Sequence, residues 1–311
     1  MAVYAITGGA GFIGSHLVDD LLAEGHQVRV LDDLSTGRRS RLDPRASLLV
    51  ADVADPVALT RLLSGADAVF HLAAIASVVR SHEEWAEAHR VNQTGTVAVL
   101  DAARQAGRIP VVYASSAAVY GDQPGAAHEA LPPAPRSAYG ADKLGSELHA
   151  AVAFGVHGVP TAGFRFFNIY GPRQDPNSPY SGVISIFAGR VARRERLTIH
   201  GDGLQQRDFV YVGDAVRHLR AGLRLVQTTP QSVVLNVCTG RGTTILDLAR
   251  TMGRIIGRAP DLDFAPARQG DIRASVGNPQ QARALLDVSA ETGLEYGLSA
   301  TLATGDLLVA A

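Results

Sequence analysis

The feature that most constrains the fold is a glycine-spaced loop near the start of the chain, Gly8-x-x-Gly11-x-x-Gly14. It follows a short apolar run at residues 3–6 and leads into a helical pattern at residues 15–23. Glycines at this spacing let the backbone approach a pyrophosphate, and a helix N-terminus favours its negative charge. The strand–loop–helix order predicts a dinucleotide-binding loop; the alternative is a tight turn packed under the helix.

Short apolar runs alternate with helical patterns through the first half of the chain. Strands are predicted at residues 28–31, 47–51, 68–72 and 110–114, with a long helical stretch at about 84–106. Strands rich in β-branched residues and separated by helices imply a parallel sheet covered on both faces. Polar residues follow these strands, where such sheets bind ligands. The sequence predicts an α/β, Rossmann-type doubly wound parallel sheet.

The alternation of strand and helix patterns ends after Asn168. Gly, Pro and Asn accumulate at residues 171–179 and indicate a loop. A helical patch follows. Further strands are then expected at 197–203, 209–212 and 233–237, and a helix at 244–256. We expect an NAD-binding domain over 1–167 plus about 213–240, and a smaller substrate lobe over 168–212 and 241–311.

Acidic residues end two of the predicted strands. Asp32 lies where a carboxylate can bind both hydroxyls of an adenosine ribose and repel a 2′-phosphate, which selects NAD over NADP. Arg38 and Arg39 follow closely and would weaken that preference if they reached the ribose. Asp52 ends the next strand, either as a contact to the adenine or as a turn residue.

A second motif, Tyr139-x-x-x-Lys143, lies near the middle of the chain and places a phenol and an ammonium on one helix face. A phenol beside an ammonium ionises more easily, so Tyr139 is expected to be a base near neutral pH. Ser116, after the strand at 110–114, supplies a hydroxyl that can relay a proton. Many such pairs only decorate helix surfaces. Combined with the glycine loop, this pair predicts an enzyme that moves a hydride and a proton.

Composition narrows the class of protein. The 311 residues are 46% hydrophobic and 19% charged, with a net charge of −1. With so small a net charge, the chain as a whole would not attract nucleic acid or an anionic membrane electrostatically. The single Cys238 excludes an internal disulfide and favours a cytoplasmic setting. No signal peptide or apolar run long enough to span a membrane is apparent.

The remaining charged and histidine residues carry no predicted site. His71 lies on an apolar strand and is interpreted as a core residue, and the histidines lack metal-ligand spacing, so no metal is expected. The basic run Arg190, Arg193, Arg194 and Arg196 is interpreted as a solvated helix face.

Together these motifs resemble the extended short-chain dehydrogenase/reductase superfamily, and within it the nucleotide-sugar epimerases similar to UDP-glucose 4-epimerase. The resemblance spans residues 1–275 and includes the stretches 7–14, 32–37, 72–74, 115–121, 165–168, 171–174, 207–210 and 270–273. It implies that NAD is held by Gly8, Gly11, Phe12, Ile13, Gly14, Asp32, Asp33, Leu34, Ser35, Thr36, Gly37, Asp52, Val53, Leu72, Ala73, Ala74, Ala76, Asn92, Ser115, Tyr139, Lys143, Phe166 and Phe167.

The same resemblance implies a UDP-sugar substrate and, through pairing of the two helices at 84–106 and around Tyr139, a homodimer. Arginines suit the diphosphate because their planar forks match its oxygens, and residues 198–200 would surround the uracil. The implied substrate-binding residues are Ser116, Tyr139, Asn168, Gly182, Val183, Thr198, Ile199, His200, Arg207, Arg268, Asp271 and Ser275. Ser116, Tyr139 and Lys143 would be catalytic.

Two further comparisons within the superfamily sharpen the expected activity. Dehydratases and decarboxylases place acids just after the strand-end serine, whereas here Ala117 and Ala118 follow it. This favours a UDP-hexose 4-epimerase acting on UDP-glucose and UDP-galactose. Ser275 matches a position where a bulky aromatic limits the sugar at C2, so N-acetylated sugars are also expected to fit. The alternatives are a UDP-glucuronate 4-epimerase, a dehydratase or a reductase, and, in another class, a non-catalytic NAD-sensing module.

Overall fold

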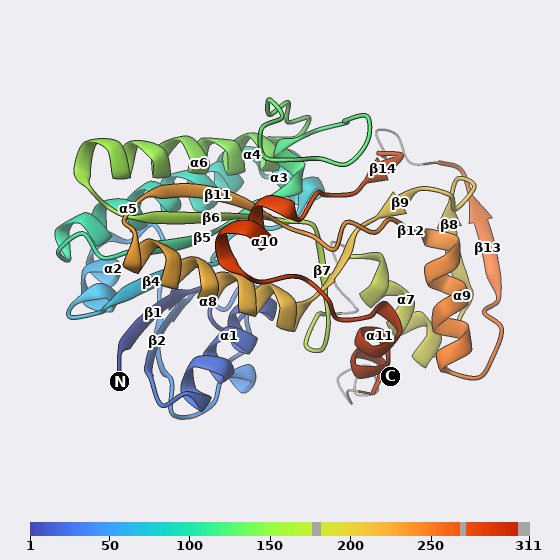
Figure 1. Ribbon diagram of the computed structural model, residues 1–311. Helices are drawn as coiled ribbons and strands as arrows, with labels where there is room; N and C mark the ends of the chain where they lie inside the picture. Colours follow the sequence, from blue (N-terminus) through green and yellow to red (C-terminus); the bar gives the residue numbers. More distant parts are fainter. Residues whose placement is uncertain (176–181, 268–271, 304–311) are drawn as a thin grey trace.

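A computed structural model describes residues 1–175, 182–267 and 272–303. Within these residues the main sheet has seven parallel strands in the order β11-β6-β5-β4-β1-β2-β3 (Figure 1). The order reverses direction at β1, which lies between β4 and β2. The predicted Rossmann-type doubly wound sheet is therefore confirmed. The strands are β1 (Val3–Thr7), β2 (Gln27–Asp32), β3 (Ser47–Val50), β4 (Ala68–His71), β5 (Val111–Ser116), β6 (Thr161–Phe166) and β11 (Ser232–Val237).

Helices cover both faces of this sheet because successive strand residues point to opposite sides. Tyr4 and Ile6 face the side on which the apolar residues of α1 (Phe12–Ala23) and α8 (Val212–Thr228) pack. Ala5, between them, faces the cluster that includes α2, α5 and α6. These three helices span Pro56–Leu63, Gly95–Gln105 and Ala138–His157. The carboxyl ends of the strands stay open, which leaves room for a ligand.

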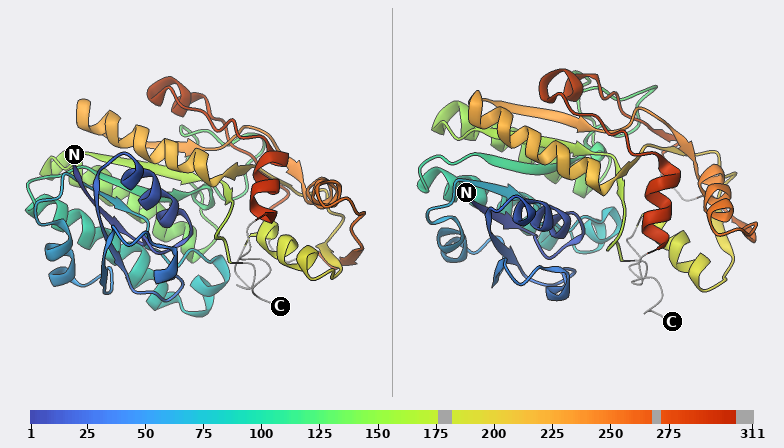
Figure 2. Two further views of the ribbon diagram at one scale, coloured as in Figure 1. Left: turned by 90° about the horizontal axis from the view of Figure 1, so that it is seen from below. Right: turned by 60° about the horizontal axis from the view of Figure 1, so that its bottom comes forward.

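A smaller lobe lies at one end of the molecule, where Figures 1 and 2 show α7, α9 and α11 beside one another. Its core contains Phe187, Ile199, Leu248 and Leu298, all of which are buried. Its elements are β7 (Asn168–Tyr170), α7 (Val183–Ala192), β8 (Leu197–His200), β9 (Gln206–Arg207), β10 (Phe209–Tyr211), β12 (Thr243–Thr244), α9 (Ile245–Ile255), β13 (Leu262–Ala265), β14 (Ala274–Ser275) and α11 (Leu294–Leu302). Another short helix, α10 (Gln280–Leu286), contacts α8 and β11.

One predicted element differs from the structure. The long helical stretch at 84–106 is divided into α4 (Trp85–His89), a π-helical turn (Arg90–Thr94) and α5, and α3 (Val78–Glu83) precedes it. The division coincides with the buried Asn92, whose side chain hydrogen-bonds both the N–H and the carbonyl of Ile75. Short 3-10 helical turns are also present at Arg39–Arg41 and Ala117–Val119. None of the described helices is both long and apolar enough to cross a membrane.

Candidate active site

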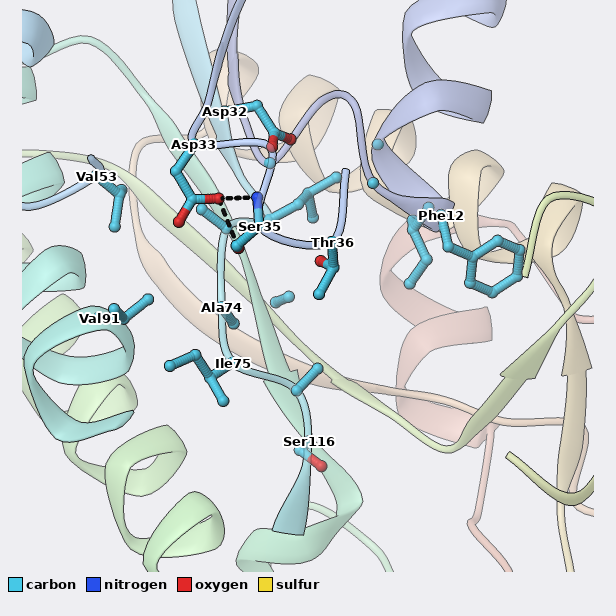
Figure 3. A pocket seen from close by; sticks show the side chains of 18 of the residues that line it. Phe12, Asp32, Asp33, Ser35, Thr36, Val53, Ala74, Ile75, Val91 and Ser116 are labelled. Carbon is cyan, nitrogen blue, oxygen red and sulfur yellow. Dashed lines mark hydrogen bonds between the residues drawn. The ribbon is translucent and has the colours of Figure 1, made fainter. Parts of the chain in front are cut away.

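A hollow at the carboxyl ends of the strands is lined by the glycine loop, by residues after β2, and by Ser116 and Tyr139. Figure 3 shows Asp32 and Asp33 at the end formed by β2, and Ser116 at the end of β5. The hollow lies at the carboxyl end of β1, where the strand order reverses. Open α/β sheets bind dinucleotides at this point.

The three glycines of the loop have different structural roles. A Cβ on Gly8 would lie 2.5 Å from the backbone nitrogen of Ala73, and one on Gly14 would lie 2.7 Å from Gly9 Cα. Both glycines therefore allow close packing of backbone against backbone. At Gly11 the nearest described atom would be Gly8 O at 3.1 Å. Gly11 also precedes α1, which has no side-chain cap. The first N–H groups of this helix therefore have no side-chain acceptor, which is typical of a helix N-terminus that binds a phosphate.

The carboxylate of Asp32 organises the loop after β2. Its two oxygens accept hydrogen bonds from the N–H groups of Ala10 (2.9 Å) and Leu34 (2.9 Å). Burial raises the pKa of Asp32, while these two N–H groups oppose the rise. Arg38 does not turn toward this carboxylate; its guanidinium pairs with Asp175 at 3.0 Å. The arrangement thus fits the adenosine ribose of NAD, with Arg38 engaged elsewhere.

The next residues of this loop complete the adenosine end. The carboxylate of Asp33 accepts from the N–H and the hydroxyl of Ser35 (Figure 3). Gly37 leaves room for Asp32, because a Cβ there would lie 2.5 Å from Asp32 Oδ1. Asp52 also lines the hollow and pairs with Arg90 at 2.6 Å.

Tyr139 and Lys143 lie one turn apart on α6, and the Lys143 ammonium is 5.8 Å from the centre of the Tyr139 ring. Lys143 is buried and donates to the carbonyl of Ala114 at 2.8 Å. Burial lowers the pKa of Lys143 to about 8, against the attraction of Asp142. Helix and strand end therefore bring a phenol, an ammonium and the Ser116 hydroxyl into one hollow.

The expectation that Lys143 makes Tyr139 easy to ionise is wrong for this state of the protein. Burial raises the pKa of Tyr139, and the Ser116 hydroxyl opposes the rise. The ammonium, 5.8 Å from the centre of the ring, does not offset the loss of water around the phenol. A further positive charge close to the phenol would lower the pKa of Tyr139.

A buried ion pair supports the strand end beside the predicted catalytic residues. Glu147, one turn beyond Lys143, accepts from Arg165 Nε (2.9 Å) and Nη2 (2.7 Å), and from the Ser115 hydroxyl. The Arg165 guanidinium also lies 4.7 Å from the centre of the Tyr120 ring. The hydroxyl of Ser115 is thus engaged by Glu147. Glu147 was not among the predicted residues, although its spacing from Tyr139 and Lys143 places all three on one helix face.

Most of the predicted NAD-binding residues line this hollow. They are Gly8, Gly11, Phe12, Ile13, Gly14, Asp32, Asp33, Ser35, Thr36, Asp52, Val53, Leu72, Ala73, Ala74, Ala76, Ser115, Tyr139, Lys143, Phe166 and Phe167. Three predicted residues do not line the hollow but stabilise loops that do: Leu34, Gly37 and Asn92. The role of each of these residues in binding NAD stays a prediction.

A second hollow lies in the smaller lobe. Its lining contains six of the predicted substrate-binding residues, namely Asn168, Gly182, Val183, Thr198, His200 and Arg207. Arg207 Nη1 donates to the carbonyls of Gln206 (2.8 Å) and Ile272 (2.7 Å). Ile199 is buried in the core of the lobe, because alternate residues of β8 point to opposite faces.

A further predicted substrate residue lies elsewhere. Ser275 is paired with Arg207 across β14 and β9, and it does not line either hollow. Arg268 and Asp271 lie outside the described residues.

The interpretation of the basic run as a solvated face is wrong for Arg190. Arg193 and Arg196 do form exposed ion pairs, with Glu195 at 2.8 Å and Asp261 at 2.9 Å. Arg190 instead lines the second hollow and donates to Thr198 Oγ1 at 2.6 Å. The helical repeat of α7 carries Gly182, Val183, Ile186 and Arg190 along that side of the helix, a signal the run of charges obscured.

His71 behaves as a core residue, as predicted. Its two ring nitrogens hydrogen-bond Thr7 (2.7 Å) and Thr96 (2.9 Å), and burial lowers its pKa to about 3, so it is neutral. Within the described ranges, no group of three or more His, Cys, Asp or Glu side chains is arranged to hold a metal ion.

Comparison with known proteins decides the family. A model of the "NAD dependent epimerase/dehydratase family" matches residues 4–238. The chain belongs to this family. It is 36% identical to a UDP-glucose 4-epimerase of Mycolicibacterium smegmatis over 307 residues, which cover 96% of each chain. The predicted superfamily, dependence on NAD and isomerase class are confirmed at the level of these relatives.

Solved structures agree with this membership. A UDP-glucose 4-epimerase from Thermus thermophilus in complex with NAD superposes with a TM-score of 0.90 at 35% identity, covering 99% of this chain and 100% of its own. A UDP-N-acetylglucosamine 4-epimerase from Methanobrevibacter ruminantium, in complex with UDP-N-acetylmuramic acid, has a TM-score of 0.92 at 31% identity, covering 99% and 98%. Such neighbours differ in their sugars, so the family alone leaves the substrate open.

Proposed function

We propose that the chain is a UDP-hexose 4-epimerase that interconverts UDP-glucose and UDP-galactose, and also accepts N-acetylated forms, with NAD retained between turnovers. The observation that carries the proposal is the single set of acid–base groups at the end of β5. Ser116 and Tyr139 line the hollow there, and the turn that follows Ser116 is Ala117–Val119, without a carboxyl group. Dehydration or decarboxylation would call for a further acid at this place.

Epimerisation needs one base and a recoverable hydride. The glycine loop, Asp32 and Lys143 would hold NAD, which when bound would supply a reversible hydride acceptor for C4 of the sugar. Tyr139, as phenolate, takes the proton of the C4 hydroxyl, and Ser116 is placed to relay that proton. After the 4-keto sugar turns over, the same tyrosine returns the proton while the hydride comes back to the opposite face. Protons, hydride and cofactor balance within one cycle, so no external reductant is consumed.

The second hollow is proposed to bind the UDP half of the substrate. In the described part of the chain β8 pairs with β13 alone, and the N–H groups of Leu197 and Gly201 donate toward that strand. Because alternate peptide groups of a strand face opposite edges, those of Thr198 and His200 lie along the other edge, beside the hollow. A strand edge offers both donors and acceptors, which matches the imide edge of uracil.

A homodimer is proposed on the outer face of α5 and α6. Along α6, Leu148, Val152 and Val156 are 61%, 51% and 70% exposed, and Val97 of the neighbouring α5 is 36% exposed. Their spacing of four residues makes an apolar stripe of the kind that helices bury against each other. Light scattering that finds a monomer at micromolar concentration would reject this assembly. The cytoplasmic setting and the domain boundaries stay predictions.

The direct test is to incubate purified protein with UDP-galactose and separate the products by chromatography. We expect UDP-glucose, without added cofactor and without a net change in nicotinamide absorbance. Stoichiometric consumption of reduced cofactor would indicate a reductase, and release of water or carbon dioxide a lyase. An epimer formed only from UDP-galacturonate would indicate a glucuronate-type enzyme. NAD binding without conversion of any of these sugars would leave the NAD-sensing alternative.

A further inference from the structure

Arg190 is a charged residue of the second hollow that the sequence pattern did not assign. It lies near the end of α7, and its Nη1 donates to the Thr198 hydroxyl at 2.6 Å and to the carbonyl of Arg196 at 3.2 Å. Both Arg190 and Thr198 line the hollow. The guanidinium is thus held in place by β8 while it borders the space in which a ligand would lie.

The charges around this hollow favour an anion. Among the described residues, its lining contains two arginines and no carboxylate; besides Arg190 and Arg207 these residues are Asn168, Gly182, Val183, Ile186, Phe187, Thr198, His200, Gln205 and Ile245. Guanidinium groups present several N–H donors in a planar fork that matches phosphate oxygens. The two arginines come from different elements, α7 and β9, so their positive ends border the same space from different parts of the lobe.

The hydrogen bond to Thr198 has a directional consequence. A threonine hydroxyl has one proton and two lone pairs. Since Thr198 Oγ1 accepts from Arg190, its proton is directed away from the guanidinium and is available to an acceptor on a ligand. Arg190 therefore makes Thr198 a hydrogen-bond donor at the edge of β8.

We propose that Arg190 is a nucleotide-recognition residue that acts on the UDP half of the substrate in two ways. It fixes Thr198 as a donor to a carbonyl or hydroxyl oxygen of the uridine, and it places a positive charge beside the diphosphate. The inference rests on the proposed UDP-sugar substrate but not on the chemistry at C4, because the catalytic residues lie in the other hollow.

Binding of free UDP to the NAD-loaded protein, measured by titration calorimetry, tests this without turnover. A hydrogen bond to a charged group is worth enough that Arg190→Ala should weaken UDP binding by about 10- to 100-fold. Thr198→Val should weaken it less, and the losses in the double variant should fall short of their sum because the two side chains act together. Arg190→Lys, which keeps the charge but not the fork, should be intermediate.

The neighbouring arginine provides a matched control. Arg193→Ala removes a charge from the same run, but its guanidinium pairs with Glu195 outside the hollow; UDP binding should stay within about twofold of wild type. Melting temperature and NAD content identify any variant that fails to fold, and Arg190→Lys and Thr198→Val then carry the test. UDP binding that is unchanged in Arg190→Ala, or reduced equally in Arg193→Ala, would overturn the inference.

The outcomes also separate this inference from the proposed activity. A wild-type protein that binds UDP but does not convert UDP-galactose contradicts the epimerase assignment, while the variants still decide the role of Arg190. A wild-type protein that does not bind UDP contradicts both.

Discussion

The two hollows of the molecule are built in different ways. The one at the strand ends includes a loop in which glycines leave no room for a side chain, and this loop leads into a helix N-terminus at Gly11. The one in the smaller lobe is formed by side chains on α7, β8 and β9, with arginines as its charged groups. A substitution that adds a side chain therefore meets backbone in the glycine loop of the first hollow, whereas in the second hollow it exchanges one lining side chain for another.

The largest expected effect separates chemistry from binding. Tyr139→Phe removes the base but leaves both hollows intact, so kcat should fall by about 10²- to 10⁴-fold, the usual contribution of an acid–base group. NAD content and UDP affinity should stay close to wild type. Tyr296→Phe is the matched control, because Tyr296 lies on α11, is 70% exposed and lines neither hollow. Near-native turnover in Tyr139→Phe would move the base to another residue.

A second prediction concerns the buried charge of the first hollow. The pKa of Lys143 is lowered from 10.5 to about 8 by burial, which corresponds to about 3 kcal/mol of unfavourable charge burial at neutral pH. Between about pH 8 and 10.5 the unfolded chain binds this proton and the folded chain does not, so Lys143 contributes stability that rises with pH.

Lys143→Met tests this sign in protein stripped of NAD. By urea unfolding, the variant should be favoured relative to wild type at pH 7, and the difference should shrink as the pH rises toward 10. The NAD content of the variant should be low, because the ammonium is lost. A difference in free energy of unfolding that does not change with pH would show that the charge of Lys143 is not at issue.

A third pair of substitutions compares the two hollows directly. Gly14→Ala should lower the free energy of unfolding by about 1–3 kcal/mol, the usual cost of overpacking, because the added Cβ would meet the loop backbone. It should also reduce the NAD content of the purified protein. Gly182→Ala should have little effect on either, since the nearest atom to its Cβ would be Gln174 Nε2 at 3.6 Å. Gly155→Ala, in open space on α6, controls for the substitution itself. Equal sensitivity at Gly14 and Gly182 would contradict the contrast between backbone and side-chain construction.

The smallest effect is expected in the choice of sugar. Ser275 lines neither hollow but is paired with Arg207, which lines the second one, so its role beside C2 of the sugar is a prediction from the family resemblance. On that prediction, UDP-N-acetylglucosamine should be epimerised at a rate comparable with UDP-glucose. Ser275→Tyr should reduce the rate on the acetylated sugar by about tenfold or more, since close-packed surroundings cannot absorb several added heavy atoms. The rate on UDP-glucose serves as the internal control. Protein that is inert toward acetylated sugars with Ser275 in place would assign the limit to another residue.

The first hollow could be predicted far better than the second. Strand periodicity, the glycine spacing and Tyr139-x-x-x-Lys143 are local patterns, and the carboxyl ends of parallel strands bring them together by topology. The second hollow combines α7, β8 and β9, whose approach depends on packing in the smaller lobe. For that reason the sequence pattern predicts a surface charge at Arg190, which in fact lines the second hollow. The direction of the Tyr139 pKa shift also cannot be predicted from local spacing, because burial is a tertiary property.

The central claim is that one bound NAD removes and returns the same hydride. Protein purified without added cofactor can be incubated with UDP-galactose that carries deuterium at C4, and the product examined by mass spectrometry and NMR. We predict UDP-glucose with the deuterium retained at C4 and no label released to water or to free cofactor. Loss of the deuterium from the product, or conversion that depends on added reduced cofactor, would contradict the account.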